Sequence, residues 1–192
     1  MKILLAFAPF IAFVIIERLV GVVPGLAAGA IVSAILILRD WMNGSRQIKI
    51  LEGGTFILFA ALTAYDIFTG GVSWPIAAVR LRVDGGLLLI VLASMALRRP
   101  FTLQYAREQV ASDLWKSPEF VRTNYVITAV WAAAFAVMVA ADLALVYFPD
   151  WPHAIPIVAT VLALYAAIKF TAWYPNRAPA ASHVAPDRPM GQ

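Results

Sequence analysis

The sequence predicts an all-α fold: a polytopic membrane helix bundle with about six transmembrane helices and a short cytoplasmic amphipathic connector helix. Two features of composition indicate this class. Of the 192 residues, 62% are hydrophobic and only 14% are charged, and the mean hydropathy is +0.81. An ordinary soluble domain is about half apolar and about a quarter charged. The third observation is the recurrence of apolar stretches of roughly 20 residues, which is the length that an α-helix needs to cross about 30 Å of hydrocarbon.

Six stretches follow one another along the chain, and we expect spans near residues 3–20, 22–41, 53–68, 76–97, 121–148 and 151–173. The first contains Pro9, and the second has Pro24 in its first turn, where a missing N–H leaves no hydrogen bond unmade. Ser117 and Pro118 are typical of the N-cap and the first position of the fifth span. Residues 1–174 therefore form one transmembrane domain. The remaining residues, 175–192, are rich in Pro and Ala, and we expect them to form a disordered cytoplasmic tail.

The fourth stretch is the one that composition defines least well. Its charge-free part, residues 85–97, is too short to cross the bilayer alone. It becomes long enough if the helix begins near Ile76 and carries Arg80, Arg82 and Asp84 in its first turns. A re-entrant segment is the alternative.

The distribution of Lys and Arg predicts the orientation, because these residues concentrate on the cytoplasmic side of membrane proteins. With six spans and a cytoplasmic N-terminus, 12 of the 15 basic residues fall on the cytoplasmic side and 3 on the outer side. Removing any one span would scatter the positive charges over both sides. The asymmetry therefore supports the number of spans and places both termini in the cytoplasm.

The longest polar run between two apolar stretches is the connector, residues 98–120. Pro100 suits the first turn of a helix, and apolar residues follow at helical spacing at Leu103, Ala106, Val110 and Leu114. This pattern predicts a short amphipathic helix in the cytoplasmic interface, where basic side chains attract anionic lipid. Our candidates for binding a partner or a lipid are Arg98, Arg99, Gln104, Tyr105, Arg107, Glu108 and Lys116. The alternative is a connector that its positive charges merely anchor.

Small residues recur every four positions along the second span, at Gly21, Gly25, Gly29 and Ser33. They form one stripe that lets another helix approach closely. We expect packing against the first or third helix, and a homodimer seam is the alternative. We also expect Trp131, deep in the fifth span, to occupy a packed interior position.

Ionisable residues near the outer ends of the spans are the other candidates for function, because burying them in a membrane is unfavourable. They are Glu17, Arg18, Asp66, Arg80, Arg82, Asp84 and Asp142. Asp142 lies about two turns, or roughly 9 Å, from the outer end of its span. We expect it to pair with Arg80 or Arg82. Such a group suits an ion-paired network that aligns the helix ends, a transport or proton-relay site, or a site for a lipid headgroup or a partner.

The patterns of common enzymes do not occur. The chain has no Cys and only two His, His153 and His183, neither of which lies in a metal-binding or nucleophilic motif. No glycine-rich loop lies between a strand and a helix, and no basic patch is interleaved with exposed aromatics. We therefore expect no enzymatic activity, no cofactor, no metal and no nucleic-acid partner.

The order of these features resembles the intracellular septation protein A family, also called YciB, of small bacterial inner-membrane proteins. The resemblance rests on Pro9 and Phe10, the short junction at residues 17–24, and the series Trp115, Asn124, Trp131 and Phe135. It implies a multi-pass protein of the bacterial inner membrane that acts in envelope maintenance or division by contacting partner proteins or lipid. The alternative function is a small transporter or channel that uses Asp66, Asp142 and Arg80 or Arg82.

Overall fold

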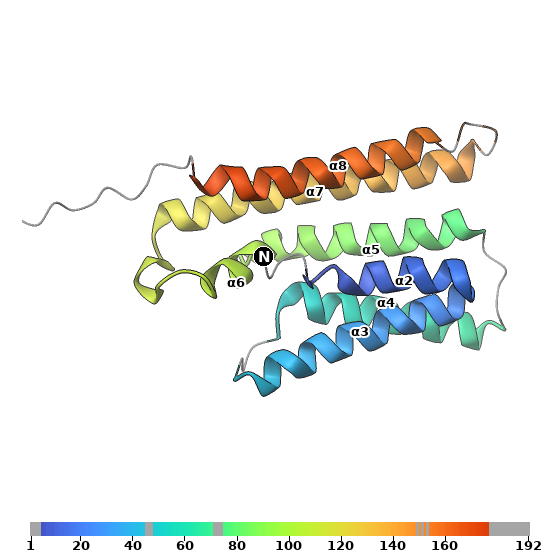
Figure 1. Ribbon diagram of the computed structural model, residues 1–192, viewed down its shortest axis with the longest axis horizontal. Helices are drawn as coiled ribbons and strands as arrows, with labels where there is room; N and C mark the ends of the chain where they lie inside the picture. The colour runs from blue at the N-terminus through green and yellow to red at the C-terminus, as the bar shows by residue number, and fades with distance from the viewer. Residues whose placement is uncertain are drawn as a thin grey trace, which may run out of the picture.

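The computed structural model describes residues 5–44, 48–70, 75–148, 150, 152 and 154–176, and over these residues the chain is helical with no β-strand. The all-α prediction is confirmed for this part of the chain. Figure 1 shows the helices α2 (Ala8–Leu19), α3 (Val22–Met42), α4 (Ile50–Phe68), α5 (Ile76–Ala96), α6 (Phe101–Arg107), α7 (Pro118–Tyr147) and α8 (Ala154–Trp173), with the 3₁₀ turns η1 (Ser112–Leu114) and η2 (Tyr174–Asn176).

The helix boundaries follow the apolar stretches, because the hydrophobic residues and the capping signals are local features of the chain. The fourth stretch is one continuous helix of 21 residues that begins at Ile76, so its three charged residues do lie in its first turns. At 1.5 Å per residue it is about 32 Å long. Ser117 caps α7 as predicted, since its hydroxyl accepts a hydrogen bond from the backbone N–H of Phe120 at 3.2 Å.

Four of the described helices, α3, α4, α7 and α8, are both long and apolar enough to cross a membrane. Helix α5 has sufficient length but carries Arg80, Arg82 and Asp84, and α2 has 12 residues. The chain therefore has the helices of a membrane protein, and the count of six spans stays a prediction.

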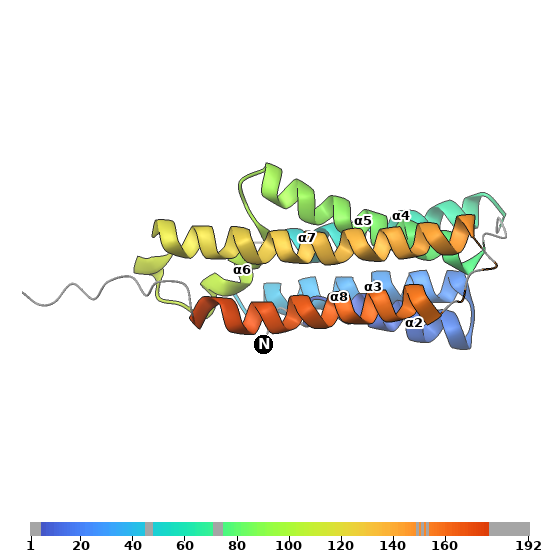
Figure 2. The same ribbon diagram turned by 90° about the horizontal axis from the view of Figure 1, so that it is seen from above.

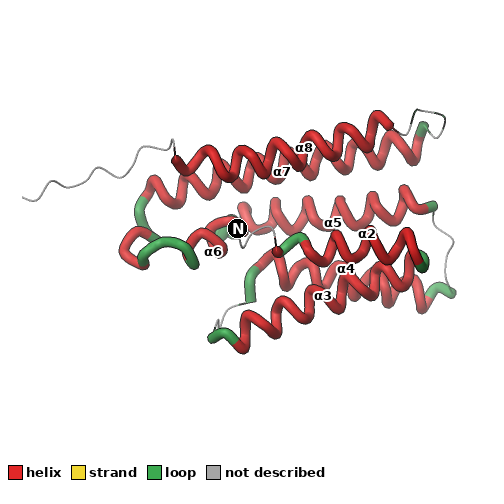
Figure 3. Tube along the Cα trace, in the orientation of Figure 1, coloured by secondary structure: helices red, strands yellow, loops and turns green. Residues whose placement is uncertain are grey.

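The long helices run side by side along the longest axis of the molecule (Figure 1). Helices α2, α3 and α4 pack in sequence, α5 lies between this group and α7, and α7 pairs with α8 over its length. The same pairing of α7 with α8 is visible from above in Figure 2. The connections lie at the two ends of the bundle, as Figure 3 shows, so the middle of the bundle consists of helix alone.

The small-residue stripe of α3 is used inside the chain. A Cβ atom added to Gly25 would lie 2.9 Å from the backbone nitrogen of Glu17 on α2, and one added to Gly29 would lie 2.8 Å from the ring of Phe59 on α4. Gly21 has a φ of 126°, which a side chain would strain, and it makes the corner between α2 and α3. The predicted packing is confirmed against both the first and the third helix, and the homodimer stays a prediction.

Two aromatic-rich clusters fill the interior. One lies among α2, α3, α4 and α5 and contains Phe13 and Phe59. The other lies among α5, α6, α7 and α8 and contains Trp131, which is buried as predicted. The Trp131 ring stacks on Phe7 with centroids 4.7 Å apart, and its indole N–H donates to the Thr171 hydroxyl at 2.9 Å.

The connector is not the single amphipathic helix that its apolar spacing predicted. Helix α6 ends at Arg107, so Val110 and Leu114 do not continue its buried face, and Leu114 is exposed. The Val110 carbonyl instead accepts a hydrogen bond from the Trp115 indole at 3.0 Å, which closes a turn beyond the helix. The spacing of four apolar residues was compatible with a helix, but this local hydrogen bond favours a turn.

Helix α6 is held against α5 and α7 by hydroxyl groups. The Ser94 hydroxyl accepts from the Phe101 N–H at 3.2 Å, and the Thr102 hydroxyl donates to the Asn124 carbonyl at 2.9 Å. Phe101 and Thr102 are buried. The first half of the connector is therefore part of the bundle and does not lie on its surface.

The predicted tail begins slightly too early. Pro175 and Asn176 belong to the 3₁₀ turn η2, which continues α8. Residues 177–192 lie outside the described part of the chain, so their predicted disorder stays a prediction.

Candidate functional site

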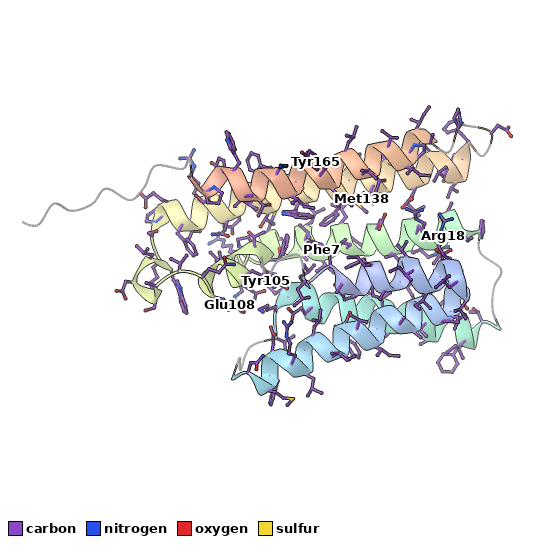
Figure 4. All side chains as sticks on the ribbon, viewed as in Figure 1. Phe7, Arg18, Tyr105, Glu108, Met138 and Tyr165 are labelled. Atoms are coloured by element: carbon purple, nitrogen blue, oxygen red, sulfur yellow. The ribbon has the colours of Figure 1, made fainter. Side chains whose placement is uncertain are left out.

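Buried charged residues gather at two places, one at each end of the bundle. Figure 4 shows Tyr105 and Glu108 at the end that holds α6, and Arg18 at the opposite end. The first group surrounds Lys49, which lies just before α4, and the second lies between α5 and α7. Only the second group was among the predicted ion-pair residues.

The first group, which we call the Lys49 network, joins three segments of the chain. The Lys49 ammonium lies 2.5 Å from Asp40 at the end of α3, 2.7 Å from Glu108 after α6, and 3.7 Å from Glu52 in the first turn of α4. The hydroxyl of Tyr105 donates to Glu52 at 3.2 Å. One cation therefore bridges three carboxylates at the point where α3, α4 and the connector meet.

Gln104 completes the attachment of the connector to α4. Its side-chain oxygen accepts from the backbone N–H of Ile50 at 2.8 Å, which satisfies one of the donors at the start of α4 that no helical carbonyl can reach. The ammonium of Lys49 also lies 4.8 Å from the centre of the Tyr105 ring. Gln104 and Tyr105, which we predicted to bind a partner or a lipid, instead form hydrogen bonds inside the chain.

Burial and ion pairing act in opposite directions on Lys49. Burial alone would lower its pKa, but the hydrogen bonds to Asp40 and Glu108 and the charge of Glu52 outweigh it and raise the pKa. Burial and the negative charge of Glu52 both raise the pKa of the Tyr105 hydroxyl. Lys49 is therefore charged and Tyr105 neutral at physiological pH, which is the combination that the observed hydrogen bonds require.

The second group is a pair of carboxyl groups, Asp84 on α5 and Asp142 on α7, which we call the carboxyl pair. Their exposed fractions are 8% and 3%. The two carboxyl groups lie close enough to interact, and the charge of Arg80 acts on both. The second oxygen of Asp142 is buried and has no hydrogen-bond partner among the described residues.

The predicted partner of Asp142 was an arginine, and the structure gives a different arrangement. The Asp142 carboxyl group interacts with that of Asp84, while Arg80 contributes through its charge. Arg82, two residues before Asp84 on α5, directs a guanidinium N–H to the Ala78 carbonyl at 2.7 Å. The carboxyl pair forms because Asp84 and Asp142 face each other across the extensive contact between α5 and α7.

The other predicted residues of this end lie on different helices. Glu17 is buried on α2, at the point where Gly25 of α3 comes closest to it. Asp66 is buried near the end of α4. Arg18 is exposed at the end of α2. These three residues therefore lie on α2 and α4, whereas the carboxyl pair lies on α5 and α7.

Two buried carboxyl groups this close together favour holding a proton, because ionising both would place two negative charges side by side away from water. Such a pair can bind a proton, release it, and change the charge of a membrane interior as it does so. Among the described residues, no group of three or more His, Cys, Asp or Glu side chains is arranged so that it could hold a metal ion. The chemistry that this site offers is therefore proton binding.

Sequence reasoning missed Asp40, Lys49 and Glu52 as a group. A signal was present, since Lys49 and Glu52 have the three-residue spacing that brings side chains together at the start of a helix. Asp40 and Glu108 could not be found in this way, because they reach Lys49 from other segments.

No family model, curated protein or solved structure matches this chain.

Proposed function

We propose that this chain is a multi-pass protein of the bacterial inner membrane with six spans, the first at residues 3–20 with α2 inside it and the others at α3, α4, α5, α7 and α8, and with both termini in the cytoplasm. The position of α2 and α5 alongside the four apolar helices supports this proposal (Figure 1). The charge distribution supports it as well. Of the described basic residues, three lie toward the end opposite the connector, Arg18, Arg80 and Arg82, and eight lie toward the connector end: Arg39, Lys49, Arg98, Arg99, Arg107, Lys116, Arg122 and Lys169. The connector end is then the cytoplasmic end.

We propose further that the protein transports protons and that the carboxyl pair is its proton-binding site. The observation that carries this proposal is the position of two buried carboxyl groups, Asp84 and Asp142, close to each other in the contact between α5 and α7. Ionisable groups are rare in such positions and are retained there mainly for ion pathways and proton relays.

The surroundings of the pair favour a proton that can leave. Releasing it would place two negative charges beside Arg80, which provides partial compensation. The unpartnered oxygen of Asp142 is available to accept a hydrogen bond from an incoming donor, such as water. If these two residues served only to hold α5 against α7, an ion pair of opposite charges or a pair of apolar residues would hold the helices together better than two carboxyl groups.

The experiment is proton uptake into proteoliposomes loaded with a pH-sensitive dye. Wild-type protein should carry protons, and Asp142→Asn and Asp84→Asn should each abolish the flux while the thermal unfolding midpoint is retained. Arg18→Gln, at the same end but outside the pair, is the matched control and should leave the flux unchanged. Flux that persists in Asp142→Asn would contradict the proposal, as would wild-type protein that carries no protons.

The second proposal is the scaffold role in envelope maintenance or division that the family resemblance implies, acting through a partner or through lipid. The observation that favours it is the connector tip, residues 111–116, where every residue is exposed. Neutralising the basic residues around this tip should remove the cellular phenotype of the wild-type gene while proton flux is kept. A phenotype that instead follows Asp142→Asn and ignores those residues would favour transport.

A further inference from the structure

The two halves of the connector have different surroundings. Helix α6 is enclosed, with Phe101, Leu103 and Tyr105 buried and Tyr105 bound to the Lys49 network. The connector tip follows as a turn whose residues are all exposed. The surface that the connector offers to another molecule is therefore the tip, and it is smaller than the sequence predicted.

The tip combines an aliphatic residue, an aromatic residue and a cation in succession. Leu114 is 45% exposed, Trp115 is 37% exposed, and Lys116 follows them. The hydrogen bond of the Trp115 indole to Val110 fixes the ring, and the Arg107 guanidinium carbon lies 5.6 Å from the ring centre. Exposed Leu and Trp beside Lys and Arg are the residues that membrane interfaces select.

The depth of the tip also suits the headgroup region. Helix α7 begins at Pro118, two residues after Lys116, and has 30 residues, or about 45 Å of length at 1.5 Å per residue. The hydrocarbon layer takes up only about 30 Å of it. The start of α7 and the tip beside it therefore lie among the headgroups at one end of the helix.

Further cations lie at the same end of the bundle. Arg98 and Arg99 follow α5, Arg122 lies in the first turns of α7, and all three are exposed. The acidic residues of this region are Glu108, Asp113 and Glu119, of which Glu108 is already bound to Lys49. Positive charge exceeds negative charge on the surface that remains.

Arg98 occupies a backbone conformation that favours glycine. Its φ is 57°, and it closes α5 with two hydrogen bonds, from its own N–H to Met95 at 3.0 Å and from the Arg99 N–H to Ser94 at 2.9 Å. Helices that end in this way most often have Gly at this position, because a side chain strains it. An arginine here gives up backbone stability and places a guanidinium at the headgroup level.

We propose that the connector tip, together with Arg98, Arg99 and Arg122, binds the phosphate headgroups of anionic phospholipids. Leu114 and Trp115 enter the interface, and the cations hold the phosphates beside them. The inference rests on the second proposed function and names lipid as the molecule that the tip contacts. It does not depend on the carboxyl pair.

The test uses the absence of Cys from the chain. Leu114→Cys, labelled with an environment-sensitive fluorophore, is reconstituted into phosphatidylcholine vesicles that contain phosphatidylglycerol, with bromine quenchers on the chains of one lipid or the other. Quenching by brominated phosphatidylglycerol should exceed that by brominated phosphatidylcholine. Arg99→Gln and Lys116→Gln should each lower the enrichment of phosphatidylglycerol over phosphatidylcholine beside the label by about fivefold. This is the effect of about 1 kcal/mol, the contribution of one basic residue near a charged membrane surface. Arg18→Gln, at the other end, should leave it unchanged.

Two variants of Arg98 separate its charge from its backbone strain. Arg98→Gly and Arg98→Gln should lose the lipid preference equally, while only Arg98→Gly should raise the unfolding midpoint. Equal quenching by the two lipids in the wild-type background would overturn the inference. So would a preference that survives Arg99→Gln and Lys116→Gln. If quenching is equal and a photocrosslinker at position 114 captures a protein in native membranes, the tip binds a partner and the scaffold proposal survives without the lipid.

Discussion

Lys49→Met should destabilise the protein, because Met keeps the length of the side chain but removes the one cation that three carboxylates share. The side chain of Lys49 is 7% exposed and that of Glu52 is 3% exposed. Breaking a buried ion pair by removing one partner typically costs about 3–5 kcal/mol. Two of the three carboxylates have other support: Asp40 keeps Arg39 at 2.7 Å, and Glu108 is partly exposed and can be hydrated. Glu52 is the carboxylate left without a cation, so we expect the lower end, about 3 kcal/mol.

The assay is reversible unfolding in mixed micelles, followed by tryptophan fluorescence. Lys116→Met is the matched control, because Lys116 is exposed at the same end, and it should change the free energy of unfolding by no more than about 0.5 kcal/mol. Adding Glu52→Gln to Lys49→Met should recover part of the lost stability, since it removes the stranded charge. A Lys49→Met variant within about 1 kcal/mol of wild type would refute the assignment of Lys49 as the cation that holds the connector.

Three further predictions use the same unfolding assay. Gly29→Ala should destabilise the protein by about 1–3 kcal/mol, because its Cβ would lie 2.8 Å from the Phe59 ring. Gly85→Ala should stabilise it by about 0.5–1 kcal/mol, because a Cβ at Gly85 would have no atom within 4 Å. The reverse order of stabilities would contradict the packing of these helices. Ser117→Ala should cost about 1 kcal/mol through the lost cap of α7, and an unchanged midpoint would show that the cap is dispensable. The raised pKa of Tyr105 contributes stability that is fully present below the unfolded pKa of tyrosine, about 10, and is lost as the pH rises through the folded value. The difference in unfolding free energy between wild type and Tyr105→Phe should therefore be constant from about pH 7 to 9 and shrink above about pH 10. A difference that changes below about pH 9 would contradict the assignment of this stability to the Tyr105 hydroxyl.

The connector illustrates where local sequence signals are sufficient and where they are not. Its ends were predicted correctly, because Pro100 and the Ser117 cap act on their own neighbours. Its interior was not, because Tyr105 faces Glu52 from a position 53 residues away along the chain, and no local pattern records that contact. The same limit applies to Asp142, because the carboxyl group with which it interacts lies on another helix.

The sequence by itself determined the class of protein and the positions of the helices. It also determined that most of the positive charge lies at one end of the helix bundle. These properties depend on the length of each apolar stretch, on caps and on the count of Lys and Arg, all of which are local. The tertiary structure alone decided which faces of the helices meet. Helices α7 and α8 are apolar on nearly every side, so hydrophobicity does not specify their rotation, and that rotation brings Asp142 to Asp84. The Lys49 network is likewise a product of assembly, since it exists only once α3, α4 and the connector have come together.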